Sequence, residues 1–172
     1  MMMASDPFSV LGLAPDFDVD AREVERAYLR RAAGAHPDVM GGDDDAAEAL
    51  AGQLNEARAV LLDAERRANA LLALRGGAAK EVDKSLPAGF LMEMMRTREE
   101  IEDALGSKDA ARVRAWREWA LAQRAGYVER VSRLFREGGS HNLVEVRKHL
   151  NAWRYVERLI EQMDAGAGGG AS

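Results

Sequence analysis

Apolar residues recur every three or four positions along most of the chain, which is the period of an α-helix. Asp6 and Pro7 predict a short helix with the aspartate at its N-cap and the proline in its first position. Asp20 and Glu23 have the spacing of a capping box and predict a longer helix. That helix should end near His36, because a proline follows it. No segment has the pattern of a strand, so we predict an all-α protein.

A second long helix is predicted by four apolar residues at helical spacing: Leu50, Leu54, Ala57 and Leu61. It can pack antiparallel to the helix before it. Asp63 then caps a short helix that runs through Leu74. The glycines at 76 and 77 are followed by a stretch without apolar periodicity. This pattern divides the chain into a domain of residues 1–76, a linker of residues 77–86 and a second helical domain.

Three helices are predicted from Pro87 onward. The first ends near Gly106, the second begins at the cap Ser107 and runs to about Arg136, and the third begins near Asn142. Their connections are short, which predicts antiparallel neighbours.

These helices form a three-helix bundle over residues 87–165, followed by a Gly-rich tail, residues 166–172, that we expect to be disordered. The expected core residues lie at helical spacing on the second and third helices: Val113, Trp116, Ala120, Tyr127, Val131 and Leu134, and Leu143, Val146, Leu150, Trp153 and Ile160.

The first helix of the bundle has more apolar residues than one buried face needs. One stripe is formed by Phe90, Met94, Ile101 and Leu105. Leu91, Met92 and Met95 lie off this stripe. From periodicity alone they fit a wide buried face as well as an exposed surface that binds another protein, for which flexible thioethers are suited.

Composition is that of a globular protein: 172 residues, 47% hydrophobic and 31% charged, with a net charge of -5. The absence of cysteine excludes disulfides, thiolate nucleophiles and Cys-ligated metals, and three histidines leave little for a metal site, so no metal or cofactor is expected. No apolar stretch is long enough to span a membrane, and the N-terminus lacks a secretory signal, so we expect a cytoplasmic protein without a membrane partner. The negative charge also disfavours nucleic acid as a partner.

Basic residues are nevertheless concentrated on the helix before His36-Pro37-Asp38, although residues 1–76 hold 8 basic and 14 acidic groups. The proline makes that tripeptide rigid, so that His36 and Asp38 project from an exposed corner. The neighbouring positive face can attract an acidic partner. Its arginines are Arg22, Arg26, Arg30 and Arg31. Each feature also has an interpretation without a binding function. In that interpretation the tripeptide is an ordinary turn that ends the helix, and the arginines form a charged face in contact with solvent.

The segment AYLRRAAGAHPD, placed between a basic helix and an apolar-striped one, resembles a J-domain, and the resemblance covers residues 5–75. It implies that the loop and the basic helix bind a DnaK-type chaperone and stimulate its ATPase, while this chain binds no nucleotide and is not an enzyme. The chaperone-binding residues would be His36, Pro37, Asp38, Arg26, Arg30 and Arg31.

The segments GFLMEMMRTREEIEDALGSKDAARV and VRKHLNAWRYVERLIEQM are similar to the C-terminal domain of the HscB family, the J-domain co-chaperones of iron-sulfur cluster assembly. This resemblance implies a J-domain, built as a helical hairpin with short flanking helices, in an L-shaped arrangement with a three-helix bundle. It also implies that the bundle binds the cluster scaffold IscU and delivers it to the chaperone HscA. By matching position the scaffold-binding residues would be Leu91, Met92, Met95, Arg96, Glu99 and Tyr155.

Two other functions stay open on the sequence. Arg96 stands where an acidic residue is expected in the HscB patch, which favours a general J-domain co-chaperone with a different client. A small helical enzyme could use His36 and Asp38 as an acid-base pair, but no second set of convergent reactive side chains accompanies them.

Overall fold

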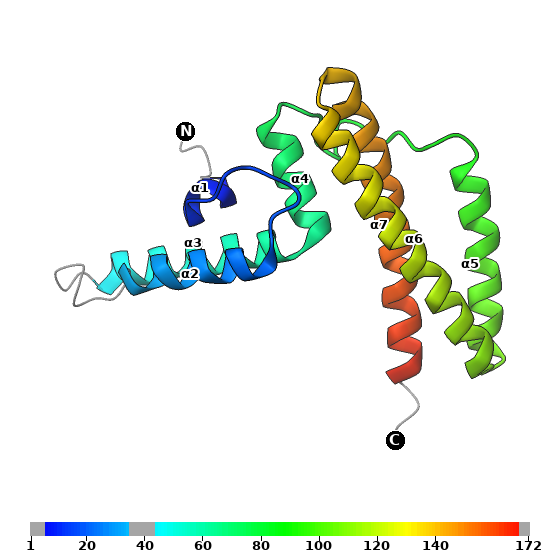
Figure 1. Cartoon of the computed structure of the whole chain (residues 1–172). Coiled ribbons are helices and arrows are strands. Elements are labelled where there is room, and N and C mark those ends of the chain that lie inside the picture. Colours follow the sequence, from blue (N-terminus) through cyan, green and yellow to red (C-terminus); the bar gives the residue numbers. More distant parts are fainter. Residues whose placement is uncertain (1–5, 35–43, 169–172) are drawn as a thin grey trace. The chain divides into compact units, whose positions relative to one another are not determined.

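The computed structural model describes residues 6–34 and 44–168, and within these ranges every regular element is an α-helix (Figure 1). The chain divides into two compact units, residues 1–76 and 77–172. We call them the first and second units. The predicted all-α class is confirmed, whereas the L-shaped arrangement stays a prediction.

The described residues of the first unit form four helices: α1 (Pro7–Leu11), α2 (Ala21–Gly34), α3 (Asp44–Leu62) and α4 (Ala64–Leu74). The carboxylate of Asp6 accepts a hydrogen bond from the Ser9 backbone N–H at 2.9 Å, and Pro7 begins α1 as predicted. Asp63 caps α4 in the same way, through the Arg66 N–H at 2.8 Å. Aspartates therefore set the starts of both short helices.

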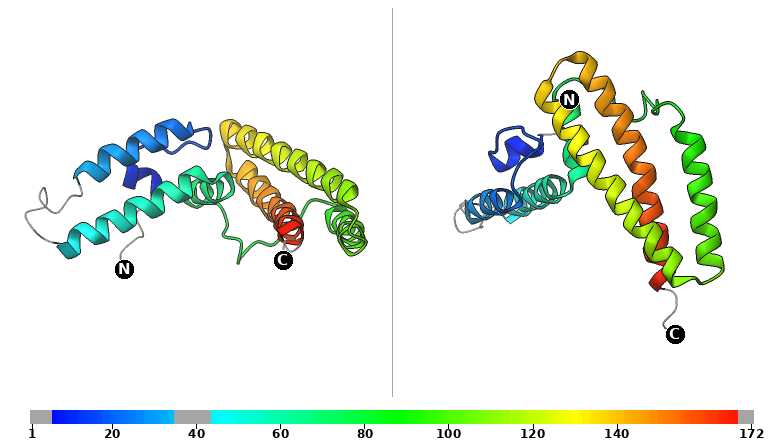
Figure 2. Two further views of the ribbon diagram at one scale, coloured as in Figure 1. Left: turned by 90° about the horizontal axis from the view of Figure 1, so that it is seen from below. Right: turned by 45° about the vertical axis from the view of Figure 1, so that its right-hand side comes forward.

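Helices α2 and α3 lie side by side as an antiparallel hairpin (Figure 2). Val24 and Ala27 of α2 are buried, as are three of the four predicted residues of α3, namely Leu54, Ala57 and Leu61. Leu50 is only half-buried. At the start of α2 the Asp20 carboxylate accepts from the Arg22 N–H at 2.7 Å. The described part of α2 ends at Gly34, so the predicted helix end near His36 lies outside the described residues.

Polar side chains also join the two helices of the hairpin. The Arg58 guanidinium donates two hydrogen bonds to the Glu25 carboxylate, at 2.9 and 2.7 Å. The Tyr28 hydroxyl donates to the Asn55 side-chain oxygen at 2.8 Å, and the Arg58 guanidinium lies 5.1 Å from the centre of the Tyr28 ring. These contacts hold α2 in one register on α3.

The second unit contains α5 (Phe90–Gly106), α6 (Ala110–Glu137) and α7 (Ser140–Gly168). Helices α6 and α7 form a long antiparallel pair, and α5 packs on both (Figures 1 and 2). Residues 77–86, predicted as a linker, belong to this compact unit and are hydrogen-bonded to α7. Residues 166–168, predicted as disordered, are the last residues of α7, and residues 169–172 lie outside the described part.

The predicted helix start at Ser107 is wrong, whereas the one near Asn142 is confirmed to within two residues. Helix α6 is capped by Asp109, whose carboxylate accepts from the Ala111 and Arg112 N–H groups at 3.1 Å, whereas Ser107 follows the end of α5. The chain first has to reverse direction, which it does with Lys108 at a φ of 54°. Helix α7 begins two residues before Asn142, whose amide donates to the Gly138 carbonyl at 2.8 Å.

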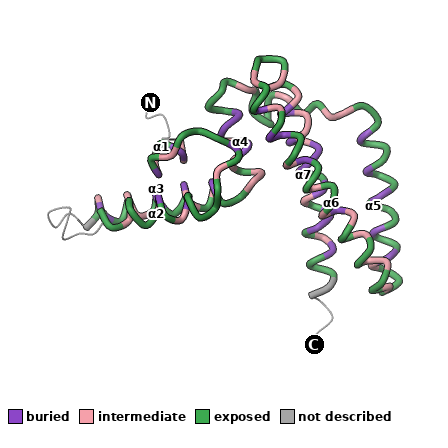
Figure 3. The backbone as a smooth tube through the Cα atoms, viewed as in Figure 1, coloured by how far each residue is buried: buried purple, intermediate pink, exposed green. Residues whose placement is uncertain are grey.

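Most of the predicted core of the bundle is buried (Figure 3). The buried members are Ala120, Tyr127, Val131, Val146, Leu150, Trp153 and Ile160. The half-buried ones are Val113, Trp116, Leu134 and Leu143. Phe135 takes the inward position that was predicted for Leu134, because it lies four residues after Val131 and so continues the same stripe.

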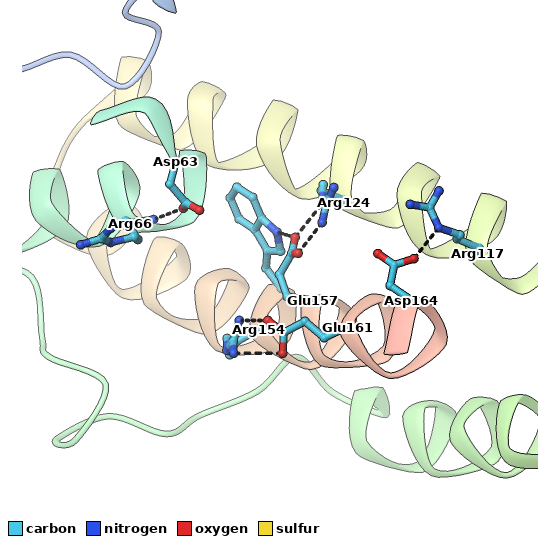
Figure 4. Close-up of polar contacts among 9 residues, drawn as sticks. Asp63, Arg66, Arg117, Arg124, Arg154, Glu157, Glu161 and Asp164 are labelled. Atoms are coloured by element: carbon cyan, nitrogen blue, oxygen red, sulfur yellow. Dashed lines mark hydrogen bonds and ion pairs between the residues drawn. The ribbon is translucent and has the colours of Figure 1, made fainter. Parts of the chain in front are cut away.

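Glu157 is the centre of a polar cluster between α6 and α7 (Figure 4). Its carboxylate accepts from the Arg124 Nε at 2.7 Å and from the Trp153 Nε1 at 2.7 Å. Burial acts to raise the pKa of Glu157, but the hydrogen bonds from Arg124 and Trp153 outweigh it and hold the pKa below its ordinary value. Toward the C-terminal end of α7, Arg117 also binds Asp164 at 2.8 Å.

The surroundings of His149 predict that the free energy of unfolding of the second unit depends on pH. Its ring is half-buried on α7, and its Nδ1 has no hydrogen-bond partner. Burial lowers the pKa of His149, and the positive charge of Arg130 lowers it further. Below about pH 6.5, the ordinary pKa of histidine, the unfolded chain therefore binds the proton more readily than the folded chain. The free energy of unfolding should fall as the pH falls through this range.

The measurement is urea unfolding at pH 7.5 and pH 5.5. We expect His149→Leu to lose part of the pH dependence shown by the native chain, whereas His141→Leu, at an exposed position of the same helix, should retain all of it. Equal pH dependence in the native chain and His149→Leu would contradict this assignment.

Candidate functional site

Three apolar side chains in the first two turns of α5 lie outside its buried stripe. Leu91, Met92 and Met95 expose 52%, 64% and 59% of their surface, whereas the stripe residues Phe90 and Met94 are buried. The wide buried face that periodicity also allowed is therefore wrong. An exposed apolar surface of this kind is typical of a site that binds another protein.

Helix α7 forms the other side of this surface. A shallow apolar groove is lined by Leu91, Met94, Met95 and Arg98 of α5 and by Tyr155 and Leu159 of α7. The rings of Phe90 and Tyr155 pack in a T-shaped arrangement, with the ring centres 5.7 Å apart and the planes at 78°. Tyr155 thus packs on α5 and still exposes 36% of its surface. We call the exposed residues Leu91, Met92, Met95 and Tyr155 the apolar patch.

Charged side chains border the apolar patch. Arg96 and Glu99 are exposed and lie one helical turn beyond Met92 and Met95. Arg98 at the groove is paired with Glu102 at 2.7 Å. An apolar centre with a charged rim is the usual composition of a protein-protein interface. Of the six predicted scaffold-binding residues, Leu91, Met95 and Tyr155 therefore line one groove, and Met92, Arg96 and Glu99 are exposed on α5.

The basic residues of α2 form a second candidate surface. Arg26 and Arg30 are exposed one turn apart, and Leu29 between them exposes 63% of its surface. Arg31 is exposed as well, but its guanidinium lies against the end of α1, where a Cβ on Gly12 would be 2.7 Å from its Nη2. Gly12 has a φ of 69°, which favours glycine. Arg26 and Arg30, like Arg22, are exposed on α2.

His36, Pro37 and Asp38 lie outside the described residues, so their geometry stays a prediction. The end of α2 and the start of α3, which flank them in the sequence, lie at the same end of the hairpin (Figure 2).

The sequence reasoning missed three residues at these surfaces. Arg98 and Leu159 line the groove, and Leu29 lies within the basic face. Leu159 could have been found from its position one turn after Tyr155. Among the described residues no group of three or more histidine, aspartate and glutamate side chains is arranged to hold a metal ion, and no helix is long and apolar enough to cross a membrane.

Comparison with known families matches both parts of the chain. Residues 6–70 match the DnaJ domain, and residues 86–164 match the HSCB C-terminal oligomerisation domain. Among solved structures, the chain is similar to the crystal structure of human co-chaperone protein HscB, with a TM-score of 0.81, 22% identity and coverage of 96% of this chain and 83% of the human one. It is also similar to chaperone HscB from Vibrio cholerae, with a TM-score of 0.75, 22% identity and coverage of 95% and 98%.

Curated relatives extend this similarity over the full length. A co-chaperone protein HscB homolog of Bordetella petrii is 32% identical over 95% of this chain and 97% of its own length. One from Chromobacterium violaceum is 38% identical over 61% of this chain and 63% of its own. A J-domain hairpin, a three-helix second unit and a relative that matches both over nearly their whole length lead to one conclusion: the chain belongs to the HscB co-chaperone family.

Proposed function

We propose that this chain is the adaptor that brings an IscU-type iron-sulfur scaffold to an HscA-type chaperone of the DnaK family. The second unit binds the scaffold through the apolar patch together with Arg96 and Glu99. The first unit binds the chaperone through Arg26, Arg30, Arg31 and the loop His36-Pro37-Asp38, and stimulates ATP hydrolysis by that chaperone.

The single observation that carries the proposal is the apolar patch. Two methionines and a leucine expose more than half of their surface on a helix whose opposite stripe is buried. Apolar side chains that remain this exposed gain little from packing within the second unit, whereas a protein partner would bury them. Tyr155 adds a large ring that is already fixed by Phe90, so little side-chain freedom is lost on binding.

The match of residues 6–70 to the DnaJ domain supports the chaperone as second partner. Arg26 and Arg30 give α2 a positive surface that can attract an acidic face of that chaperone. Joining two binding surfaces in one chain raises the effective concentration of the scaffold at the chaperone without any new contact.

A second candidate is a general J-domain co-chaperone with another client, and Arg96 favours it. The side chain is exposed at the rim of the apolar patch, where a positive charge would disfavour a partner that presents a cation there. The two functions differ in whether the scaffold changes the stimulation of the chaperone. The acid-base enzyme considered from His36 and Asp38 has lost its support, because the family is one of co-chaperones.

The test is steady-state ATP hydrolysis by an HscA-type chaperone with this chain, in the presence and absence of an IscU-type scaffold. We expect the chain and the scaffold together to stimulate hydrolysis more than the sum of their separate effects. His36→Gln should lose this stimulation while still binding the scaffold. Stimulation that ignores the scaffold would favour the general co-chaperone, and no stimulation by the native chain would contradict both.

The same assay tests whether the basic residues of α2 act through a specific contact with the chaperone or only through the net charge of the chain. Arg30→Glu should weaken stimulation most strongly at low salt, because it reverses a charge within the proposed contact surface. Arg114→Glu makes the same change in net charge at an exposed position of α6 and should leave stimulation unchanged. Equal losses in the two variants would mean that only net charge matters.

A further inference from the structure

The segment before α5 is held against α7 by two side chains. We call residues 77–89 the strap (Figure 1). The Arg147 Nε donates to the Ala78 carbonyl at 2.8 Å. The Asn151 amide donates to the carbonyls of Asp83 and Ser85, both at 3.0 Å. The strap contains a short turn, in which the Val82 and Asp83 N–H groups donate to the Ala79 carbonyl at 3.0 Å, but no helix or strand. The contacts to α7, which join residues 66 to 69 positions apart in sequence, hold it against that helix.

Arg147 is unusual because it is a buried cation. It exposes only 4% of its surface, and burial lowers the pKa of its guanidinium while Asp83 and Glu81 act in the opposite direction. Buried charges are rare unless hydrogen bonds compensate for the lost water. An apolar residue would fill this position at lower cost if its only task were to pack α7 in the bundle.

The two residues that bind the strap lie on the same face of α7 as the two that line the groove. Arg147, Asn151, Tyr155 and Leu159 follow one another at intervals of four residues and so form one stripe of the helix. The first two bind the strap, and the last two line the groove beside α5. One stripe therefore contacts both the chain that leads into α5 and the beginning of α5 itself.

The start of α5 has little else to fix it. Its N-cap is Gly89, with a φ of 77° and no side-chain hydrogen bond to the first turn. Leu91 and Met92 follow at once and are more than half exposed. The position of the first turn then depends on the buried Phe90 and Met94 and on the path of the strap before it.

From this juxtaposition we infer that Arg147 and Asn151 are positioning residues for scaffold binding: they fix the strap so that Leu91 and Met95 keep their place beside Tyr155. They act through α5 and do not touch the scaffold themselves. The inference rests on the proposed function, because it assumes that the apolar patch is the scaffold-binding surface.

The experiment measures scaffold affinity and strap order in the same variants of the full chain. Asn151→Leu keeps the size of the side chain but removes the donor, and Asn151→Gln keeps an amide. Arg147→Met removes the buried donor group. Arg154→Met is the matched control, because Arg154 lies on α7 outside the stripe and pairs with Glu161 at 3.0 Å. Since the chain has no cysteine, Lys84→Cys and Ala165→Cys, at two exposed positions, allow two spin labels to report the distance between the strap and α7.

We expect Asn151→Leu and Arg147→Met to broaden the distance distribution between the labels and to weaken scaffold binding about tenfold. Asn151→Gln should recover part of both, and Arg154→Met should change neither. Near-ultraviolet circular dichroism at the binding temperature checks that each variant is folded, so that lost affinity is not lost folding.

Three results would overturn the inference. A broadened distribution with unchanged affinity would mean that strap order does not matter for binding. Lost affinity with a strap that stays ordered would mean that these residues contact the scaffold directly. A native chain that does not bind the scaffold at all would reject the proposed function itself, and the inference with it.

Discussion

Replacing Leu91 and Met95 together with alanine is expected to raise the Kd for an IscU-type scaffold about 100-fold. Both side chains are more than half exposed in the chain alone, and both line the groove next to Tyr155. If a partner buries them, their truncation removes about 3 kcal/mol of hydrophobic stabilisation, which corresponds to two orders of magnitude in Kd. Isothermal titration with the purified scaffold measures this directly.

The matched control truncates two similarly exposed apolar residues elsewhere. Leu74 and Val144 expose 46% and 47% of their surface, and neither lies in the apolar patch. Leu74→Ala with Val144→Ala should leave the Kd unchanged. The patch variant should also unfold at nearly the native temperature, since exposed side chains contribute little to stability. A Kd that the patch variant does not change would exclude this surface as the scaffold site.

Trp153→Ala should have the largest effect on stability, lowering the free energy of unfolding of the second unit by about 3–5 kcal/mol. The indole exposes only 1% of its surface, and its Nε1 donates to Glu157 at 2.7 Å. Truncation therefore opens a cavity and removes one of the hydrogen bonds that lower the pKa of Glu157. Urea unfolding followed by far-ultraviolet circular dichroism gives the value.

Trp153→Phe separates the two contributions. It keeps most of the ring but lacks the donor, so we expect a loss of about 2 kcal/mol, between the native chain and Trp153→Ala. A phenylalanine variant as unstable as the alanine variant would show that the hydrogen bond to Glu157, and not the filled volume, dominates at this position.

Local signals in the sequence explain which helix starts could be predicted. Asp6 with Pro7 and Asp63 each stand alone as caps, and both were found in the right place. Between α5 and α6, Ser107 and Asp109 compete for the same role, and the turn at Lys108 decides in favour of the aspartate. Such a choice depends on how the chain reverses direction, which residue preferences alone do not contain.

The candidate site, too, could be predicted from the sequence only in part. Periodicity separated Leu91, Met92 and Met95 from the stripe of Phe90 and Met94, but it could not say whether they are exposed. That depends on where α7 packs, and hence on contacts between residues far apart in sequence. The approach of Phe90 to Tyr155 and the bonds from Arg147 to the strap are of this kind. Tyr155 entered the prediction only through resemblance to the HscB family.

The central claim is that one chain joins the scaffold to the chaperone, and analytical ultracentrifugation with a fluorescent scaffold tests it most directly. In the presence of ATP and an HscA-type chaperone, the native chain should shift the scaffold to the sedimentation rate of a three-component complex. The shift should be lost with Leu91→Ala/Met95→Ala and with His36→Gln. A scaffold that sediments with the chaperone equally well without this chain, or with either variant, would contradict the account.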